Sequence, residues 1–406
     1  MNDVQFKADV SAIGSLATQG PATRWLLRLL VLGMVWLILG MAVMPAGASY
    51  NPGKIYQRVL VLILYLPALV LFIARPSRGL DFWRRPLVPW VVLLLAWGLL
   101  TLAWGHTVRR ADEAGHNVSI LLFLFAWQQA LGRDEDLTRR LFVGCGLAMA
   151  LVAGVAIVQS LLAPQPDGRL IGFGVMGNSN LAAGGMGAAL LWLWPWRLDG
   201  KLWLAAKWLA IATLALFVLL TLGRSALAAL FLALVVMVLC QGGRRAWLYA
   251  GLLVGLGVIS ALVGAQMLMA RGWSLRPEIF AQSMHLFLEH PWRGLGEGTP
   301  FTFSAGGEVL THAHNMYSQL AIELGIPGLV LWTGIWLAVG WAGWRHRREA
   351  LGTIILGLWV FGTVLVQFDL PHLIDSPRPV WLITWLPLAL SLSLDRPADR
   401  SGANAA

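Results

Sequence analysis

The chain has 406 residues, of which 58% are hydrophobic and only 12% are charged, and its mean hydropathy is +0.70. A water-soluble globule of this size needs more polar residues to cover its surface, so the composition excludes a soluble protein and predicts an all-α, polytopic integral membrane protein. The net charge of +10 is expected of basic cytoplasmic loops in contact with anionic membrane lipids, and we therefore expect no nucleic-acid partner.

Apolar runs long enough to span a bilayer recur along the whole chain. They predict about twelve transmembrane helices, near residues 25–45, 56–74, 87–105, 117–132, 141–163, 171–195, 202–222, 225–241, 246–270, 326–344, 351–368 and 378–394. The first run is too long for the core of a signal peptide, so we expect it to be an anchor. With the N-terminus inside, the cytoplasmic segments hold 20 of the 30 basic residues, which predicts both termini in the cytoplasm.

This topology divides the chain into five regions. They are a cytoplasmic tail at 1–24, nine spans at 25–270, an outer loop with a polar segment at 271–325, three spans at 326–394 and a second cytoplasmic tail at 395–406. Long loops without a purpose are uncommon. We therefore expect the function in the long outer connection and in the residues that follow it.

Cysteines and tryptophans fit the same environment. Cys145 and Cys240 lie in apolar segments, so we expect neither a disulfide nor a cysteine metal site. Many of the 22 tryptophans, such as Trp25, Trp196 and Trp344, lie near the ends of apolar runs. Because amphipathic rings collect where hydrocarbon meets headgroups, these side chains are predicted to be interfacial anchors.

The long outer connection contains a helical pattern. Pro277 suits a first helical residue, because its missing N–H is not needed there. Phe280, Met284 and Phe287 then recur at helical spacing until Pro291 ends the pattern. We expect a short amphipathic helix that lies on the membrane.

Three glycines follow this helix, at Gly294, Gly296 and Gly298. Backbone amides in a glycine-rich stretch can bind a phosphate, but glycines alone do not specify such a site. The simpler prediction is a flexible linker.

A polar cluster comes directly after the loop. If the segment is helical, His312, Asn315, Gln319 and Glu323 lie on one face at steps of three, four and four, and His314 lies on a second line. A histidine suits proton transfer because its unperturbed pKa lies close to neutral pH. Two histidines with amide and carboxyl groups beside the long loop favour function over simple contact with headgroups.

Pro327 follows this cluster and cannot donate the hydrogen bond that the carbonyl of Glu323 would accept in a continuous helix. The helix should therefore break there. Residues 326–344 are long enough to span the bilayer alone. The polar helix can then lie outside, beside the long loop.

Several arginines lie on the predicted outer face. Arg224 is in the tight turn Gly223-Arg224-Ser225, where Ser225 is placed to cap the next helix and to leave a positive helix terminus beside the guanidinium. Snorkelling to lipid headgroups is the alternative. Arg276 and Arg169 repeat the arrangement before other helices, and arginine donates hydrogen bonds in pairs. Three such residues predict a pyrophosphate ligand.

Gly177-Asn178-Ser179-Asn180 lies at the outer end of the sixth predicted span. Asparagines at membrane depth need partners, and a sugar or a phosphate is expected for one of them. The small residues that follow, among them Gly185, are typical of close helix packing. No further cluster of His, Asp or Glu at ligand spacing appears on the outer side, so we expect no metal site.

These motifs, in this order, resemble those of the O-antigen ligase (WaaL) family, which shares a domain with Wzy-type O-antigen polymerases and with protein O-oligosaccharyltransferases. The matching residues are His314-Asn315 with Gly325 and Gly328, Arg224 in Leu222-Gly223-Arg224-Ser225-Ala226, Arg276 with Pro291 and Gly294-Leu295-Gly296-Glu297-Gly298, and Gly177-Asn178-Ser179-Asn180. Many members of the family have proline where Ser179 stands. The likeness covers about residues 165–345.

The resemblance implies a C-type-glycosyltransferase-like fold in the bacterial inner membrane, with residues 271–325 as the periplasmic loop and catalytic segment. It implies an inverting, metal-independent ligase without a cofactor, which transfers a glycan from undecaprenyl pyrophosphate to lipid A–core. His314 would be the general base, and Arg224 and Arg276 would hold the pyrophosphate and stabilise its leaving charge. The expected substrate-binding residues are Arg169, Asn178, Asn180, His312, Asn315, Gln319 and Glu323.

Helical spacing favours His312 as the base, whereas the family signature favours His314; we follow the signature, because residues before a helix need not share its periodicity. A polymerase would use the same motifs with another lipid-linked glycan as acceptor, and a protein-glycosylating relative usually has a larger periplasmic portion. A transporter or flippase is the alternative from another class. It should show paired helix breaks in two halves and charges near mid-membrane, and the sequence shows no such repeat.

Overall fold

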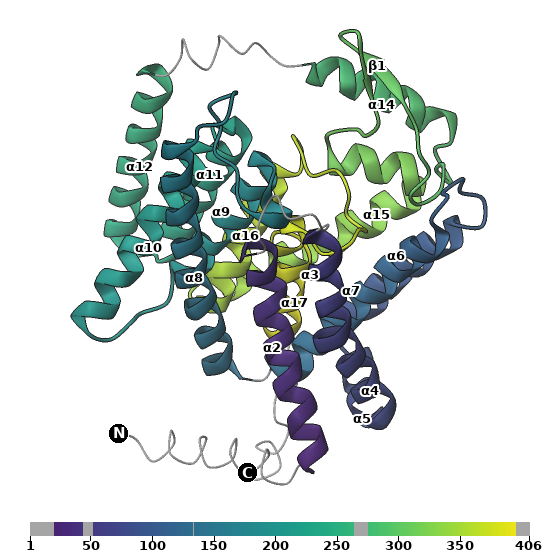
Figure 1. Cartoon of the computed structure of the whole chain (residues 1–406), viewed down its shortest axis with the longest axis horizontal. Helices are drawn as coiled ribbons and strands as arrows, with labels where there is room; N and C mark the ends of the chain where they lie inside the picture. The colour runs from purple at the N-terminus through teal and green to yellow at the C-terminus, as the bar shows by residue number, and fades with distance from the viewer. Residues whose placement is uncertain (1–19, 44–51, 133, 264–274, 395–406) are drawn as a thin grey trace.

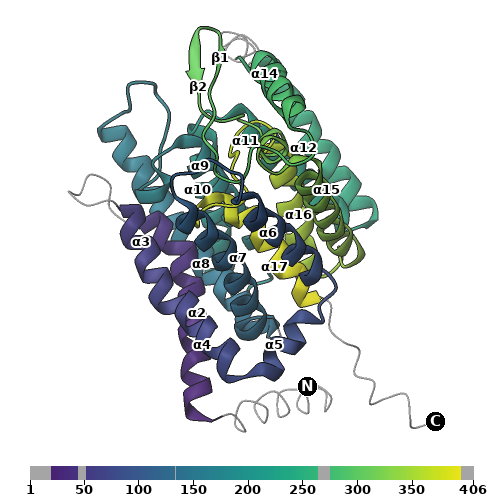
Figure 2. The same cartoon turned by 90° about the vertical axis from the view of Figure 1, so that its right-hand side faces the viewer.

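The computed structural model describes residues 20–43, 52–132, 134–263 and 275–394. The predicted C-terminal tail, nearly all of the N-terminal tail, the end of the ninth predicted span and the first residues of the outer loop lie outside these ranges. The described part is a bundle of helices with a small β-hairpin at one end, at the top of Figures 1 and 2.

The first half of the chain is helical. Its elements are α2 (Pro21–Val43), α3 (Pro52–Leu60), the π-helical turn η1 (Val61–Tyr65), α4 (Leu66–Ala74), α5 (Pro76–Trp83), α6 (Val88–Thr101), α7 (Arg110–Ala130) and α8 (Glu135–Leu162). The second half contains the 3-10 turn η2 (Gly174–Met176), α9 (Ser179–Leu193), α10 (Lys201–Leu220), α11 (Arg224–Cys240), α12 (Gly243–Val263), α14 (Arg276–Glu289), β1 (Phe303–Ala305), β2 (Glu308–Leu310), α15 (Met316–Arg345), α16 (Ala350–Leu365), the 3-10 turn η3 (Pro379–Leu382) and α17 (Trp385–Leu394).

Several of these helices are membrane spans by length and composition. Within the described residues, the helices long and apolar enough to cross a bilayer are Pro21–Val43, Gly53–Ala74, Glu135–Leu162, Lys201–Leu220 and Met316–Arg345. A sixth span is counted if α5 and α6, which are bent by 94° at a short break, form one crossing. The prediction of a helical, multi-pass membrane protein is confirmed, and the number of twelve spans stays a prediction.

Element boundaries depart from the predictions in several places. The predicted sixth span near 171–195 becomes helical only at Ser179, after η2, and the predicted last span near 378–394 consists of η3 and the short helix α17. The predicted outer loop carries the expected helix, α14, and in addition a β-hairpin that was not predicted, in which β1 pairs antiparallel with β2. Gly306 and Gly307 (φ 58° and 82°) form the hairpin turn, where a positive φ favours glycine.

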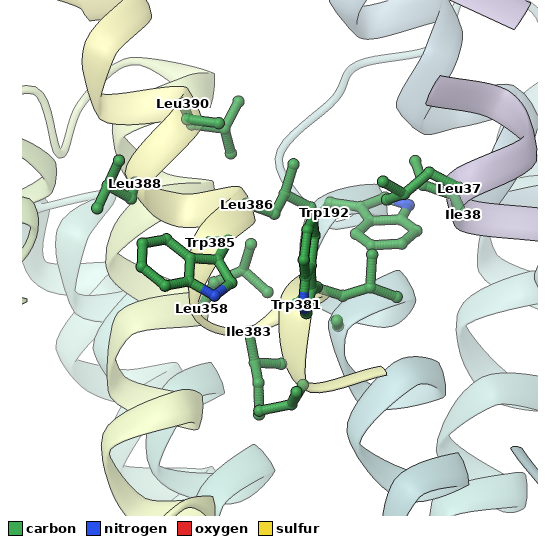
Figure 3. Packing of buried hydrophobic residues seen from close by; sticks show 14 of the residues in the cluster. Leu37, Ile38, Trp192, Leu358, Trp381, Ile383, Trp385, Leu386, Leu388 and Leu390 are labelled. Atoms are coloured by element: carbon green, nitrogen blue, oxygen red, sulfur yellow. The ribbon is translucent and has the colours of Figure 1, made fainter. Parts of the chain in front are cut away.

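Aromatic side chains fill the centre of the bundle. The largest fully buried residues include five tryptophans: Trp127, Trp192, Trp332, Trp381 and Trp385. In Figure 3, Trp192, Trp381 and Trp385 lie among leucine and isoleucine side chains of α2, α16 and α17. Trp344 is 48% exposed, as expected of an anchor, but Trp196 is only 5% exposed. The prediction of an interfacial anchor is therefore wrong for Trp196, which packs in the core.

The small residues of α9 allow its neighbours to come close. A Cβ atom at Gly187 would lie 2.5 Å from the ring of Phe361, and one at Gly185 would lie 2.5 Å from the side chain of Met176. The packing role predicted for these glycines is confirmed. Close packing holds the N-terminus of α9, with its asparagines, against the C-terminal part of the chain.

Candidate functional site

The predicted polar helix begins later than its periodicity suggests. Asn315 is the N-cap of α15, and its Oδ1 accepts hydrogen bonds from two backbone amides of the first turn at 2.9 and 3.1 Å. His312 and His314 precede the helix, so the predicted stripe through His312 is wrong. The stripe fails because an N-cap has extended backbone, after which the helical period starts anew.

The polar groups of this segment meet nevertheless. Gln319, which is buried, donates from Nε2 to Glu323 Oε1 at 2.8 Å and accepts at Oε1 from the backbone N–H of Ala313 at 3.0 Å. Asn315 donates from Nδ2 to the carbonyl of Gln367 at 3.1 Å. Ala313 and Asn315 are the neighbours of His312 and His314 in the chain, so these bonds hold the segment with the two histidines against the first turns of α15.

α15 breaks within its first half, as Pro327 predicts, although the break lies at Gly325 (φ 65°, ψ −167°). The carbonyl of Glu323 has no helical donor because residue 327 is proline. The amide of Ile326 donates to the carbonyl of Pro291 at 2.8 Å, so the carbonyl of Ile322 also lacks its helical partner. Two backbone carbonyls at the break therefore need donors from elsewhere.

The outer loop supplies these donors. The bonds are Leu295 N to Ile322 O at 2.8 Å and Gly296 N to Glu323 O at 2.9 Å, and Trp97 Nε1 adds a third bond to Leu324 O at 2.8 Å. All three carbonyls beside the break are thus hydrogen-bonded, as buried backbone groups require. The loop after α14 is bound to α15 through the break itself.

The glycines of this loop fit the docked conformation. Gly294 (φ 64°) and Gly296 (φ 99°) have left-handed backbone, and a Cβ atom at Gly294 would lie 2.3 Å from the carbonyl oxygen of Glu323. The prediction of a flexible linker is wrong, because these glycines allow close contact of two backbones. The amide of Gly296 donates to Glu323 rather than to a phosphate.

Three histidines gather at the start of α15. The ring centroids of His312 and His314 are 4.0 Å apart, and those of His312 and His372 are 6.2 Å apart. His314 Nδ1 lies 4.0 Å from Asp369 Oδ1, and His372 Nδ1 lies 4.0 Å from Glu323 Oε1. Each of these two rings therefore faces a carboxylate.

His372 and Asp369 belong to a segment that the sequence analysis did not single out. We call residues 367–378, between α16 and η3, the C-terminal strap. Arg276 donates to the carbonyl of Phe368 in this strap, and its guanidinium lies 5.4 Å from the centroid of the Phe368 ring. The strap thereby connects the start of α14 with the histidines before α15.

Asp369 also joins the strap to the N-terminus of α9. Asn180 donates from Nδ2 to Asp369 Oδ2 and accepts at Oδ1 from Arg169 Nη2 at 2.7 Å. Arg169 Nε donates to the carbonyl of Thr221 at 2.9 Å. Asn178 caps α9 with its own Oδ1. Of the residues predicted to bind substrate here, Arg169 and Asn180 hold protein groups in place.

α11 begins at Arg224, and its N-cap is Gly223, which offers no side-chain hydrogen bond. The prediction of Ser225 as the cap is therefore wrong. Burial lowers the pKa of Arg276, the charge of Asp369 opposes this effect, and the charge of Arg224 adds to it. The two guanidiniums thus act on the same region, next to Asp369.

Backbone strain is concentrated at this site. Among the described residues, the non-glycine positions with positive φ are Leu222 (52°), His314 (49°) and Leu370 (59°). Leu222 precedes Arg224 by two residues, and Leu370 follows Asp369. Such conformations cost about 1–3 kcal/mol each and cluster at functional sites. The three positions are thus the predicted base His314 and residues close to Arg224 and Asp369.

Burial acts on both histidines in front of α15. It lowers the pKa of His312 to about 4, with further lowering by His314 and His372 and an opposing effect of Asp369. Burial also lowers the pKa of His314, while Asp369 raises it and Arg276 lowers it. The lowered pKa values favour the neutral form of both rings, which can accept a proton.

A cavity of about 190 Å³ opens beside the histidines. Its polar lining consists of Asn178, His312, Asp369, His372, Asp375 and Arg378. Two of the predicted substrate-binding residues, Asn178 and His312, lie in this lining. Within the described ranges, no three His, Cys, Asp or Glu side chains are arranged as a metal site.

Two comparisons with known proteins find similarity to O-antigen ligases. Residues 209–333 match the Wzy_C family, described as O-antigen ligase, and this segment holds Arg224, Arg276 and His314. Over 252 residues, the chain is 29% identical to the O-antigen ligase of Pseudomonas aeruginosa, and the match covers 60% of this chain and 62% of that protein. Over these parts of its length, the chain is therefore similar to O-antigen ligases.

Proposed function

We propose that the chain is an O-antigen ligase of a bacterial inner membrane. Its donor is a glycan on undecaprenyl pyrophosphate, its acceptor is lipid A–core, and its active site faces the periplasm. The observation that carries the proposal is the meeting of Arg276, His314 and Asn180 at Phe368 and Asp369 of the strap. Residues from three motifs that are far apart in the sequence thereby meet at one short segment, which supports the proposal.

His314 is assigned as the general base. Its Nδ1 faces the carboxylate of Asp369 at 4.0 Å, which favours the tautomer with the proton on Nδ1 and leaves Nε2 to accept a proton. Nε2 takes the proton of the acceptor hydroxyl while that oxygen attacks the anomeric carbon of the donor. The bond from the anomeric carbon to the phosphate oxygen breaks, and one displacement inverts the anomeric configuration.

Arg224 and Arg276 are assigned to the pyrophosphate. Arg224 is the first residue of α11 and Arg276 the first residue of α14, so each guanidinium lies at a positive helix terminus. Planar guanidinium groups donate in pairs to phosphate oxygens and stabilise the negative charge that grows on the leaving group. The phosphate leaving group provides the driving force, and no nucleotide is needed.

The other predicted residues divide between substrate contact and support. Asn178 and His312 line the cavity and are assigned to a substrate. The supporting residues, which hold the histidines and the strap, are Arg169, Asn180, Asn315, Gln319 and Glu323. A C-type-glycosyltransferase-like arrangement of the spans goes with this assignment.

The lipopolysaccharide banding pattern of a deletion strain tests the function. Loss of a ligase removes all long-chain glycan from lipid A–core, whereas loss of a polymerase leaves a single repeat unit. An unchanged pattern, with the chain exporting a lipid or another solute, would support a transporter or flippase instead. Complementation by the wild-type chain, but not by His314→Ala, links the phenotype to the site.

A further inference from the structure

The cavity beside the histidines is built mainly by the strap, which no sequence motif covers. Asp369, Leu370, Pro371, His372, Asp375 and Arg378 all line it. Its volume of about 190 Å³ is below the roughly 300–1,000 Å³ of sites for drug-sized ligands. A space of this size suits one sugar ring and is too small for a lipid chain.

The charges of the lining select for a neutral, hydroxyl-rich ligand. Asp375 Oδ2 pairs with Arg378 Nη1 at 3.2 Å, and Asp369 accepts from Asn180 and faces His314. The arginine of this lining is thus already paired with a carboxylate, so the lining favours a neutral ligand over an anionic phosphate. Carboxylate oxygens and an asparagine amide instead accept and donate the hydrogen bonds that sugar hydroxyls need. Leu181 and Val380, which also line the cavity, can pack against the apolar face of a ring.

The order of contacts along the strap places the cavity relative to the reaction. Phe368 binds Arg276, Asp369 faces His314, and His372 faces Glu323 further along the strap. Neither Arg224 nor Arg276 lines the cavity. His312, whose ring lies 4.0 Å from that of His314, does line it, so the cavity adjoins the assigned base and not the residues assigned to the pyrophosphate. In a direct displacement the attacking oxygen approaches opposite the leaving group, so a sugar in the cavity is on the side of the acceptor.

We propose that this cavity is the subsite for the terminal sugar of the acceptor, and that Asn178, His372 and Asp375 determine which sugar is accepted. The proposal rests on the proposed ligase function. Within that function it commits to the acceptor, because the cavity adjoins the assigned base, whereas Arg224 and Arg276, which are assigned to the donor's pyrophosphate, do not line it. Recognition of one neutral sugar ring by the strap then decides which lipid A–core molecules receive a glycan.

A labelling experiment tests the cavity without relying on catalysis. Leu181 is partly exposed in the cavity wall, and the native Cys145 and Cys240 are buried. Leu181→Cys in the full-length protein should react with a maleimide. Lipopolysaccharide that lacks O antigen should slow the reaction at least about tenfold, whereas an undecaprenyl-pyrophosphate glycan should not. Protection by the donor alone, or by neither lipid, overturns the proposal.

Substitutions complete the test. Asp375→Asn and His372→Gln should raise KM for the acceptor about tenfold or more and leave KM for the donor unchanged, and Glu308→Gln, which removes an exposed carboxylate in β2, should change neither constant. Because Asp375 also accepts from the amide of Ser376, Leu181→Trp provides a second variant that fills the cavity without touching these bonds. A rise in KM for the donor in these variants overturns the proposal.

The ligase function and the acceptor subsite can be tested separately. If the deletion strain keeps its full banding pattern, the ligase function is wrong, whatever the labelling shows. If the strain loses all long-chain glycan but lipopolysaccharide gives no protection of Leu181→Cys, the function stands and the assignment of the cavity is wrong.

Discussion

His312 and His314 have rings only 4.0 Å apart, yet their surroundings differ. Asp369 faces His314, whereas His312 lies in the cavity wall beside His372. We expect His314→Ala to lower turnover by about 10²–10⁴-fold, the usual contribution of a general base, and to keep donor binding, because the proposal assigns the pyrophosphate to the arginines. His312→Ala should retain measurable turnover. Purified variants assayed with both lipids decide this, and a fully active His314→Ala beside an inactive His312→Ala would assign the base to His312.

The protonation state of His314 gives a second prediction at this scale. As the proposed base, His314 works only when neutral, so kcat/KM should fall as the pH drops through its pKa. Burial lowers the pKa of His314 below its ordinary value of 6.5 and the charge of Asp369 raises it. Asp369→Asn should therefore move the acid limb of the pH profile to lower pH, while Asp369→Glu, which keeps the charge, should move it much less. An upward shift in Asp369→Asn would contradict the assignment.

Arg224 tests the role of paired donors. Arg224→Lys keeps one positive charge at the N-terminus of α11 but loses the planar fork that binds two phosphate oxygens. We expect about a tenfold or greater loss of ligation at normal levels of protein in the membrane. Wild-type activity in this variant would show that Arg224 is an interfacial anchor, the alternative that its position in the sequence left open.

At the scale of elements, local signals predicted the helix of the outer loop and the break in α15. Pro277 lies in the first turn of α14, and Pro327 predicted a break that lies at Gly325. The docking of the loop could not be predicted in this way. Gly294 and Gly296 lie against the carbonyl of Glu323, close to the backbone at Gly294 and hydrogen-bonded to the amide of Gly296. Glu323 comes almost thirty residues later in the chain.

The contribution of the break in α15 to stability can be tested at Gly325. Gly325 has φ 65°, and a Cβ atom there would lie 2.5 Å from the carbonyl oxygen of Trp292. Gly325→Ala should destabilise the protein by at least about 1–3 kcal/mol from backbone strain alone, and it should loosen the loop from the helix. Gly334→Ala, where no atom lies within 4 Å, is the matched control in the same helix. Thermal unfolding in detergent compares them, and equal stability would mean that the break is dispensable.

The position of the strap beside α9 and α15 could not be predicted from the sequence. Asp369 and Asn180 are 189 residues apart in the chain, and periodicity or motif spacing reports only neighbours within one element. The sequence did contain a sign of the strap, because Asp369, His372 and Asp375 lie between two apolar runs, on the predicted outer side. That run of polar residues predicts an outer connection. It does not predict which other loops meet it, because that depends on how α9, α14 and α16 pack.

At the scale of the whole molecule, hydropathy predicted the class of protein better than the number of spans. α16 has 16 residues and is buried along almost all of its length, and α11 is also shorter than a full span. A helix surrounded by other helices needs apolar residues on every face, as a span in lipid does. Composition alone therefore cannot separate a core helix from a helix that crosses the membrane.

The placement of the site on one side of the membrane is the last prediction. From the break at Gly325 to Arg345, α15 continues for about 20 residues or about 30 Å, which matches the hydrocarbon thickness. Residues before the break and residues after Arg345 should therefore lie on opposite sides. A reporter that is active only in the periplasm should work when fused within residues 280–305 and fail when fused near Arg347. The reverse pattern would move the histidines, the arginines and the cavity to the cytoplasmic face, where a periplasmic ligase cannot meet its substrates. Activity at both positions would mean that the second half of α15 does not cross the membrane.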